Sequence, residues 1–367
     1  MSCLADAECG TRDALHSMTT PPESSLPANG GSNPLSEDRR RILEIWCRIR
    51  PVSEAVPFEE EIEAADAVVT GAVEYTRHFM EEVRRGKVVD CREAVPLVDQ
   101  LIASATRNQS AVISLAKLKV HDEYTFHHCI NVAMFSIIFG RSLGLPREAQ
   151  RVLGLAGIYH DVGKARIPEE ILKKPDQLNS EEFTLIKRHA VEGYRVMRDS
   201  SMLHHDVLLA IMQHHERHDG QGYPRGLSGQ SISPLARVVS LVDVYDALTS
   251  NRCYRKASTP TAALGHIYQQ QWTHFFPTYV ERFIKCIGVF PPGSLVRLTD
   301  GSIAVVRSVN PEYSLLPMVS VCLDQQLRRC QPVTIDLAQV RAEGLNLGIQ
   351  GCVDPRPLRI DPALLIR

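Results

Sequence analysis

The sequence has no apolar run of membrane-spanning length, no CxxC pair of cysteines and no excess of basic residues. Without an apolar run of about 20 residues, a membrane-spanning helix is excluded. The first residues show no basic start followed by an apolar block, so no secretory signal is expected and a cytoplasmic location is predicted. A formal net charge of −2 argues against binding of long DNA or RNA, which needs a basic surface. Binding of a small anionic ligand remains compatible with this net charge, because it needs only a local group of cations.

The ten cysteines follow no metal-finger spacing, and we expect them to be reduced and mostly buried. No internal repeat is visible. Histidine, by contrast, is clustered: of 14 in the chain, ten lie between His121 and His218. Since neutral imidazole is the commonest metal ligand in proteins, this clustering indicates a metal site.

Composition and periodicity predict a mainly α-helical chain with a small C-terminal β module. We expect four parts: a disordered tail over 1–37, rich in Ser, Pro and Gly; a helical N-terminal region over 38–118; a helical middle domain over 119–284; and a β-rich module over 285–367. Asp300-Gly301 is typical of a hairpin turn between two strands.

Local signals also predict where several helices begin. Asn179 and Ser180 precede a helix with Glu181 and Glu182 in its first turn. We further expect Asp206 to be the N-cap of the helix VLLAIMQHH, and Ser233-Pro234 to open the helix that contains VVSLVDVYDAL.

Polar residues with metal-ligand chemistry occur on successive predicted helices. They are His128, His160-Asp161, His189, His214-His215 and Asp243, and each group follows the previous one by 25 to 32 residues, about one helix pair. Taken singly, each has an ordinary structural explanation, such as a polar helix end or a satisfied core histidine. Because they occur in this order on successive helices, all of them can lie in one core. Nitrogen and oxygen ligands without thiolate suit Fe(II), Mn(II) or Zn(II).

The segments that carry these residues resemble the HD-GYP subgroup of the HD phosphohydrolase superfamily. The matching text is YTFHHCINVA, YHDVGKARIP, KRHAVEG, HHERHDGQGYP and LVDVYDALTSNRCYR. The resemblance covers about 119 to 284, and HHERxDGxGYP is its most specific string. It implies a helical HD-type bundle and a phosphodiesterase that opens cyclic di-GMP to pGpG, with further cleavage to GMP left open.

Carried over position by position, the resemblance implies metal ligands at His128, His160, Asp161, His189, His214, His215 and Asp243, with Asp161 as the bridge. Some members have a glutamate four residues before the first ligand histidine, where this chain has Tyr124. We therefore expect two divalent ions, Fe(II) or Mn(II), rather than three.

Further site residues follow from chemistry and resemblance together. Lys164 is expected to act with Asp161 in catalysis by neutralising phosphate charge in the transition state. Arg252 and Arg255 are expected to bind the dinucleotide through their guanidinium groups, and Tyr223 to stack on a base. Asp246 is expected to contact a ligand histidine or Lys164 and so hold that side chain in position, without binding the metal itself.

Three alternatives to the principal hypothesis stay open at this level. The site of an HD phosphohydrolase also suits another cyclic dinucleotide, because composition does not select the base. A non-catalytic receptor or adaptor for a cyclic dinucleotide is a second alternative, and a structural protein with an incidental histidine cluster is a third. A second copy of the chain or a diguanylate cyclase domain are the protein partners considered.

Overall fold

The computed structural model describes residues 56–118, 124–174, 176–198, 203–250, 256–310, 312–355 and 358. Its described helices are α2 (Phe58–Arg84), α3 (Ala94–Arg107), α4 (Gln109–Leu118), α5 (Tyr124–Ser142), α6 (Arg147–Tyr159), α7 (Glu169–Leu172), α8 (Ser180–Lys187), α9 (His189–Arg198), α10 (His205–Gln213), α11 (Pro234–Thr249), α12 (Pro260–Gln269), α13 (Pro277–Ile287) and α14 (Leu337–Ala342). Short 3₁₀ segments are η2 (Cys91–Glu93), η3 (Val162–Arg166) and η4 (Gly229–Ser231). The predicted tail over 1–37, and the start of the predicted helical region, lie outside the described residues.

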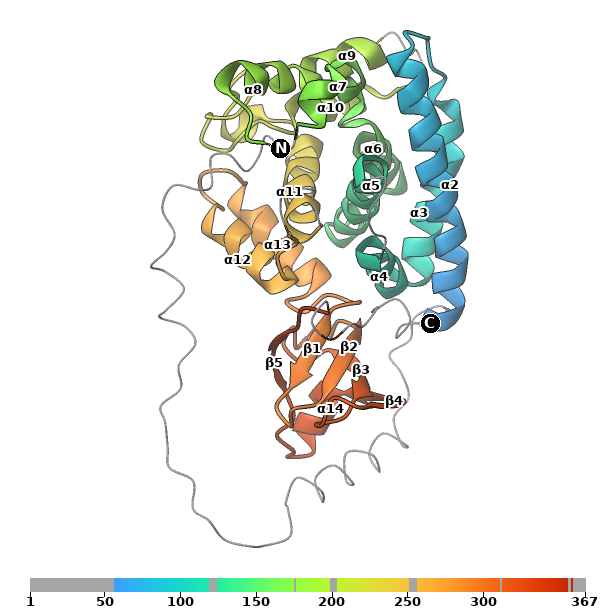
Figure 1. The fold of residues 1–367 in the computed structure, drawn as a ribbon, viewed down its shortest axis with the longest axis vertical. Helices are drawn as coiled ribbons and strands as arrows, with labels where there is room; N and C mark the ends of the chain where they lie inside the picture. The colour runs from blue at the N-terminus through green and yellow to red at the C-terminus, as the bar shows by residue number, and fades with distance from the viewer. Residues whose placement is uncertain are drawn as a thin grey trace, which may run out of the picture.

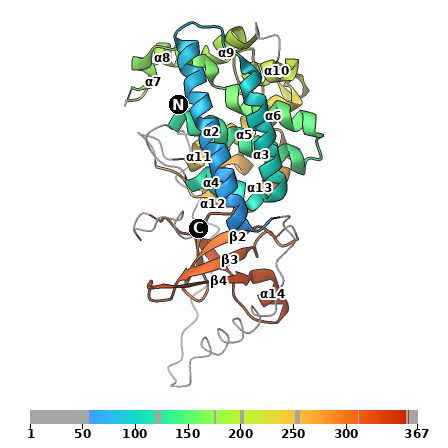
Figure 2. The ribbon, with the colours of Figure 1, turned by 90° about the vertical axis from the view of Figure 1, so that its right-hand side faces the viewer.

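The helices form a bundle, and a small sheet lies below it in the view of Figure 1. This arrangement confirms the predicted fold class. Helices α2 and α3 lie on the right-hand side of the bundle in Figure 1, and this side faces the viewer in Figure 2. Among the described residues, no helix is long and apolar enough to cross a lipid bilayer.

The N-terminal helix α2 packs through one face and remains polar on the other. Its buried side chains include Ile62, Ala65, Val69 and Val73, which recur at helical spacing. Glu61 is also buried, and its carboxylate is satisfied by Arg107 of α3 and the hydroxyl of Ser104. This ion pair and the apolar stripe together join α2 to α3.

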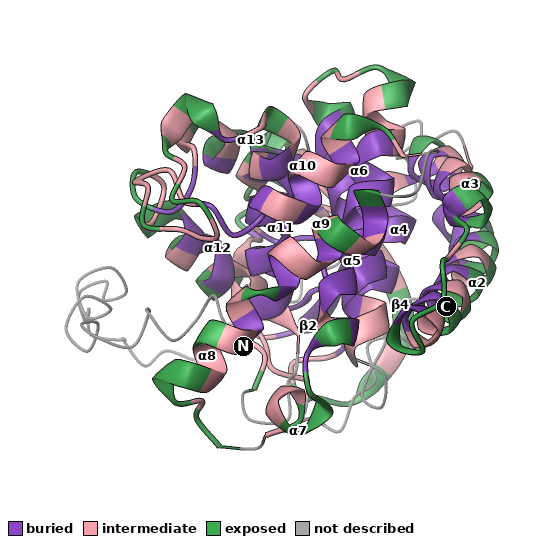
Figure 3. Ribbon diagram, turned by 90° about the horizontal axis from the view of Figure 1, so that it is seen from above, coloured by how far each residue is buried: buried purple, intermediate pink, exposed green. Residues whose placement is uncertain are grey.

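Helices α5, α6 and α11 lie at the centre of the bundle, where Figure 3 shows mostly buried residues. A Cβ on Gly157 of α6 would lie 2.4 Å from Cα of Ala133 on α5, so glycine allows these two backbones to meet closely. Helix α11 is buried along nearly its whole length, from Ala236 to Leu248. The buried polar residues of α5 and α11, such as His128 and Asp243, therefore lie inside the bundle.

The predicted helix starts are largely right. Asn179 forms a reciprocal capping box with Glu182 at the start of α8, and Ser233-Pro234 opens α11. The prediction for Asp206 is wrong, because α10 begins two residues earlier than expected. His204 is its N-cap, and the ring Nδ1 of His204 accepts a hydrogen bond from the backbone N–H of Asp206, which lies in the first turn.

The C-terminal sheet is antiparallel and has the strand order β4-β3-β2-β1-β5. Its strands are β1 (Leu295–Leu298), β2 (Ile303–Ser308), β3 (Met318–Leu323), β4 (Arg329–Asp336) and β5 (Ile349–Cys352). The hairpin predicted at Asp300-Gly301 joins β1 to β2, with Gly301 at φ +89°. Alternate residues face opposite ways: Leu295 and Ile303 join the helical core, whereas Val296 and Ala304 form a second core with α14.

Candidate metal centre

The structure brings the seven predicted ligands into one buried cluster. His128 lies in the first turns of α5, His160 caps the C-terminus of α6, and Asp161 follows it. The remaining four come from three more helices: His189 begins α9, His214 caps the end of α10 with His215 next to it, and Asp243 lies within α11. Each of the seven side chains is less than a tenth exposed. His128 and Asp243, which are 115 positions apart in the chain, thus lie in the same buried cluster.

Two groups of three side chains have the spacing of metal sites. Ligand atoms of His128, His160 and Asp243 lie within 4.8 Å of one another, and those of His189, His214 and His215 do the same. In the first group, Nε2 of His128 lies 3.1 Å from Oδ1 of Asp243. In the second, Nε2 of His189 lies 3.2 Å from Nε2 of His214.

Asp161 lies between these two groups. Its Oδ1 is 3.5 Å from Nε2 of His189, on the side of the second group. Its Oδ2 is 3.4 Å from Nε2 of His160 and 3.8 Å from Nε2 of His128, on the side of the first. Each carboxylate oxygen therefore faces a different set of imidazoles, so Asp161 would be the residue shared by ions held by the two groups.

Backbone contacts fix the tautomers of three of these histidines. Nδ1 of His160, His189 and His214 lies 2.7 to 2.8 Å from the carbonyl oxygen of the residue three positions earlier in the chain. A carbonyl only accepts, so each Nδ1 carries the proton and donates it. In the neutral ring, Nε2 is then left with its lone pair free, and all three Nε2 atoms point into the cluster.

Burial keeps most of the imidazoles neutral. Removal from water lowers the pKa of His189 to about 4 and that of His214 to about 3, and it holds the pKa of His215 well below its usual value. Burial works against ionisation of Asp161 as well, but the neighbouring Lys164 and His160 outweigh it and hold its pKa well below the usual range. Neutral imidazole and ionised carboxylate are the forms that bind a metal ion.

The pKa of His128 is shifted in the opposite direction, because this ring lies between two carboxylates. Burial lowers its pKa, but hydrogen bonds to Asp243 and Asp246 outweigh this effect and raise the pKa to about 9. Its Nδ1 donates to Oδ2 of Asp246 over 2.7 Å. Oδ1 of Asp246 in turn accepts a hydrogen bond from the side-chain amide of Asn131, one turn after His128 on α5. Of the two partners considered for Asp246, the structure therefore shows a contact with His128.

These donors fit a pair of divalent cations. Nε2 of His160 is buried and has no hydrogen-bond partner among the residues that the structure describes. The Nε2 atoms of His189 and His214, which both carry lone pairs, face each other at 3.2 Å. Converging lone pairs of this kind repel unless a cation lies between them, and mixed imidazole and carboxylate ligands suit Fe(II), Mn(II) or Zn(II).

The other predicted site residues are placed as follows. Nζ of Lys164 lies 2.5 Å from Oδ2 of Asp161, and its side chain is a quarter exposed. The ring of Tyr223 lies 4.7 Å from that of His215, at a tilt of 31°. Arg252 and Arg255 lie outside the described residues, so their predicted contact with substrate stays a prediction.

The loop that follows His215 is attached by its backbone to the cluster. The amide of Tyr223 donates to the carbonyl of His215 over 3.1 Å. The buried carboxylate of Glu216 accepts hydrogen bonds from the backbone amides of Arg225 and Leu227, each over 2.8 Å. A Cβ on Gly222 would lie 2.5 Å from the carbonyl oxygen of His215, so a glycine is required at this close approach.

Sequence reasoning did not assign roles to Asn131 and Glu216. The spacing of Asn131, three residues after His128 in an apolar helix, is the signal that would have placed it on the same face. Of the remaining histidines between His121 and His218, His204 and His205 are exposed, while His127 and His218 are partly buried. His121 lies outside the described residues.

Comparison with known proteins places this site in a family context. A family model described as "HD domain" matches residues 101–278. A Pseudomonas aeruginosa protein named as a cyclic di-GMP phosphodiesterase is 38% identical over 281 residues, 76% of this chain and 67% of the relative. A Vibrio cholerae protein named as a 3'3'-cGAMP-specific phosphodiesterase is 35% identical over 163 residues, 44% of this chain and 37% of the relative.

A solved structure shows a similar fold. It is an HD-GYP-type protein, written HDG"Y"P, of Bdellovibrio bacteriovorus, with a TM-score of 0.53, 19% sequence identity and coverage of 66% of this chain and 76% of that one. At this identity the likeness concerns the fold alone.

Proposed function

The chain belongs to the HD-GYP group of HD-domain proteins, and on that premise we propose that it is a metal-dependent phosphodiesterase that hydrolyses cyclic di-GMP. The Pseudomonas relative has this activity in its name, and its similarity extends over three quarters of the present chain. The product is expected to be linear pGpG, with GMP as the product of a second cleavage.

One observation carries the proposal: the two oxygens of Asp161 face two separate groups of buried ligands. We infer that His128, His160 and Asp243 hold one divalent ion, that His189, His214 and His215 hold the other, and that Asp161 bridges them. When bound, such a pair lowers the pKa of water to near neutrality and neutralises charge on a phosphodiester. Two ions, Fe(II) or Mn(II), remain our expectation, because Tyr124 occupies the position at which some members have an additional glutamate.

The protein's own residues supply the remaining requirements. Asp246 fixes the ring of His128 through Nδ1, so that Nε2 points into the cluster. The ammonium group of Lys164 is the cation next to Asp161, and its partial exposure allows contact with an incoming phosphate. We propose that Tyr223 lies against a base of the substrate, since its ring is already held beside His215. Arg252 and Arg255 complete the proposed substrate contacts.

The test is turnover of cyclic di-GMP by protein loaded anaerobically with Fe(II) or Mn(II), with products separated by chromatography. We expect pGpG from the native chain, and loss of both bound metal and turnover in Asp161→Ala. The exposed His205→Ala is the matched control and should retain both. Tight binding of cyclic di-GMP without cleavage in fully loaded native protein would contradict the proposal and support the receptor alternative.

A second candidate substrate is supported by the Vibrio relative, whose name specifies 3'3'-cGAMP. The same metal centre suits any cyclic dinucleotide, because it acts on the phosphodiester and not on the base. Initial rates on equal concentrations of cyclic di-GMP, 3'3'-cGAMP and cyclic di-AMP separate the candidates. We expect cyclic di-GMP to have the highest kcat/KM. A higher value for 3'3'-cGAMP would show that the proposed substrate is wrong, while phosphodiester hydrolysis would remain the proposed reaction.

A further inference from the structure

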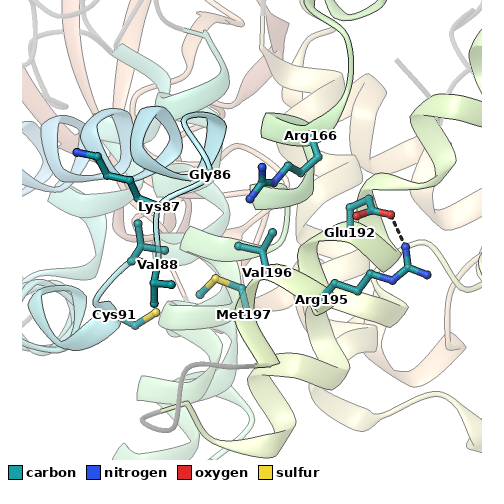
Figure 4. A pocket seen from close by; sticks show the side chains of 10 residues that line it. Gly86, Lys87, Val88, Cys91, Arg166, Glu192, Arg195, Val196 and Met197 are labelled. Atoms are coloured by element: carbon teal, nitrogen blue, oxygen red, sulfur yellow. Dashed lines mark hydrogen bonds and ion pairs between the residues drawn. The ribbon is translucent and has the colours of Figure 1, made fainter.

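A cleft with a volume of about 440 Å³ lies outside the metal centre, between the segment that follows α2 and the helix α9. Figure 4 shows Gly86, Lys87 and Val88 on one side and Val196 and Met197 on the other, with Arg166 at its edge. This volume is within the usual range for small-molecule sites. Nothing in the proposed reaction uses this cleft.

The cations of the cleft differ in whether they are already paired. Lys87 forms an ion pair with Glu82 at 2.6 Å, and Arg195 forms one with Glu192 at 2.6 Å. Arg166 is exposed, and in the described part of the chain its guanidinium group has no hydrogen bond or ion pair. In Figure 4 this group points toward the space between the two walls. A free guanidinium fork of this kind binds carboxylate or phosphate.

The rest of the lining is largely apolar. Val88 is 96% exposed, which is unusual for a valine, and it lies on the wall opposite Val196 and Met197. Val89 and the buried Cys91 extend the same surface. A ligand that covers Val88 would remove this apolar side chain from water while placing an anionic group near Arg166.

Arg166 and one wall of the cleft, helix α9, belong to segments that also carry residues of the metal centre. Arg166 ends the 3₁₀ segment η3, which follows Asp161 and contains Lys164. Val196 lies on α9, whose first residue is His189. A Cβ on Gly163 would lie 1.9 Å from the carbonyl oxygen of His189, so η3 and α9 are in direct backbone contact. This contact connects the cleft to the segments that carry Asp161 and His189.

We propose that this cleft is a regulatory site for a small amphipathic anion, with a carboxylate or phosphate group bound by Arg166 and an apolar body against Val88 and Val196. The ligand joins the segment after α2 to α9 and thereby biases the arrangement of Asp161 and His189. The binding itself is independent of the reaction, whereas the regulatory effect rests on the proposed metal centre.

Binding is tested by isothermal titration of the metal-free full chain with octanoate, octyl phosphate and octanol. We expect both anions to bind more tightly than octanol, and their relative affinities decide between a carboxylate and a phosphate ligand. Arg166→Gln should weaken the anions about tenfold, the loss of one charge-assisted contact, and leave octanol unchanged. Arg282→Gln, an exposed arginine of α13, is the matched control and should bind like the native chain.

Equal affinity for octanol and the two anions, absence of binding, or full retention of anion binding in Arg166→Gln would each overturn the site. Regulation is tested by the dissociation constant of the tighter anion in metal-free and Mn(II)-loaded protein. Since coupling between two sites is reciprocal, we expect at least a threefold difference, and equal constants would overturn the regulatory role. A chain that takes up no metal would refute the proposed function while leaving the binding result intact.

Discussion

Nε2 of His189 lies 3.2 Å from Nε2 of His214, and the opposite nitrogen of each ring is bound to a backbone carbonyl. The carbonyls hold the protons on Nδ1, so the two facing atoms are both acceptors. Two acceptors at this distance are stable only with a cation or a proton between them. The low pKa values of these rings, about 4 and about 3, disfavour the proton near neutral pH, and this is consistent with our proposal that a metal ion binds between them.

Removal of one of these rings should reduce the stabilisation of the chain by metal. Addition of Mn(II) at about 100 times its dissociation constant should stabilise the native chain by about 2.7 kcal/mol for each ion bound, visible as a higher Tm. In His189→Ala we expect the part of this increase that is due to the ion held by His189, His214 and His215 to disappear. His205→Ala changes an exposed histidine at the start of α10 and should keep the native increase. A full Mn(II) response in His189→Ala would contradict the ligand assignment.

The metal-free protein should be most stable near pH 6.5. The pKa of His128 is raised to about 9, above its unfolded value of about 6.5, so its contribution is complete below pH 6.5 and is lost as pH rises through 9. The pKa values of His189 and His214 are depressed to about 4 and about 3, so their contribution is present above pH 6.5 and is lost as pH falls toward those values.

This profile is measured by urea unfolding of metal-free protein between pH 5 and pH 9.5. His128→Asn should reduce the loss of stability above pH 6.5 (the alkaline limb of the profile) and leave the loss below pH 6.5 (the acidic limb) unchanged. Metal loading should also weaken the alkaline limb, because coordination requires His128 without its Nε2 proton. An alkaline limb that is unchanged in His128→Asn would show that another group controls it.

Replacement of Asp246 should weaken metal binding without unfolding the chain. Asp246→Asn keeps an oxygen for the Nδ1 proton of His128 but removes the charge that supports the ring. Loss of such an outer contact typically costs 10- to 100-fold in metal affinity, and we expect a decrease in this range by competition with a chelator. Asp206→Asn, in the first turn of α10, is the control and should bind metal normally. Native affinity in Asp246→Asn would refute the orienting role.

The close approach at Gly222 gives a steric prediction. A Cβ there would lie 2.4 Å from the backbone nitrogen of Arg217 and 2.5 Å from the carbonyl oxygen of His215. Gly222→Ala should therefore cost about 1–3 kcal/mol of stability and displace His215 enough to reduce turnover at least tenfold. Gly265→Ala is the matched control, because a Cβ at Gly265 meets nothing within 4 Å and lies within helix α12. We expect it to be neutral or stabilising.

Much of this site can be predicted from the sequence because its residues occur at regular intervals on successive helices. The intervals indicate one shared interior, and the structure places His128 and Asp243 3.1 Å apart. Alternation of apolar residues likewise predicts the hairpin between β1 and β2. The helix start at His204 was not predictable, because the cap is a ring nitrogen, whereas the usual signals favour Asp206.

Other features depend on contacts between distant segments and leave no local signal. The role of Glu216 depends on the path of the loop that returns to meet it at Arg225 and Leu227. The tautomers of His160 and His189 depend on how closely each ring approaches the carbonyl three residues before it. The cleft beside Arg166 is formed only when α9 packs near the segment after α2.

The most direct test of the account is electron paramagnetic resonance of the full chain loaded with Mn(II), combined with measurement of metal content. If Asp161 bridges two ions, the native chain should hold two Mn(II) per molecule and give the multiline spectrum of an exchange-coupled pair, and Asp161→Ala should lose that spectrum. One ion per chain with the six-line spectrum of isolated Mn(II), or a coupled spectrum that persists in Asp161→Ala, would contradict a shared two-metal centre.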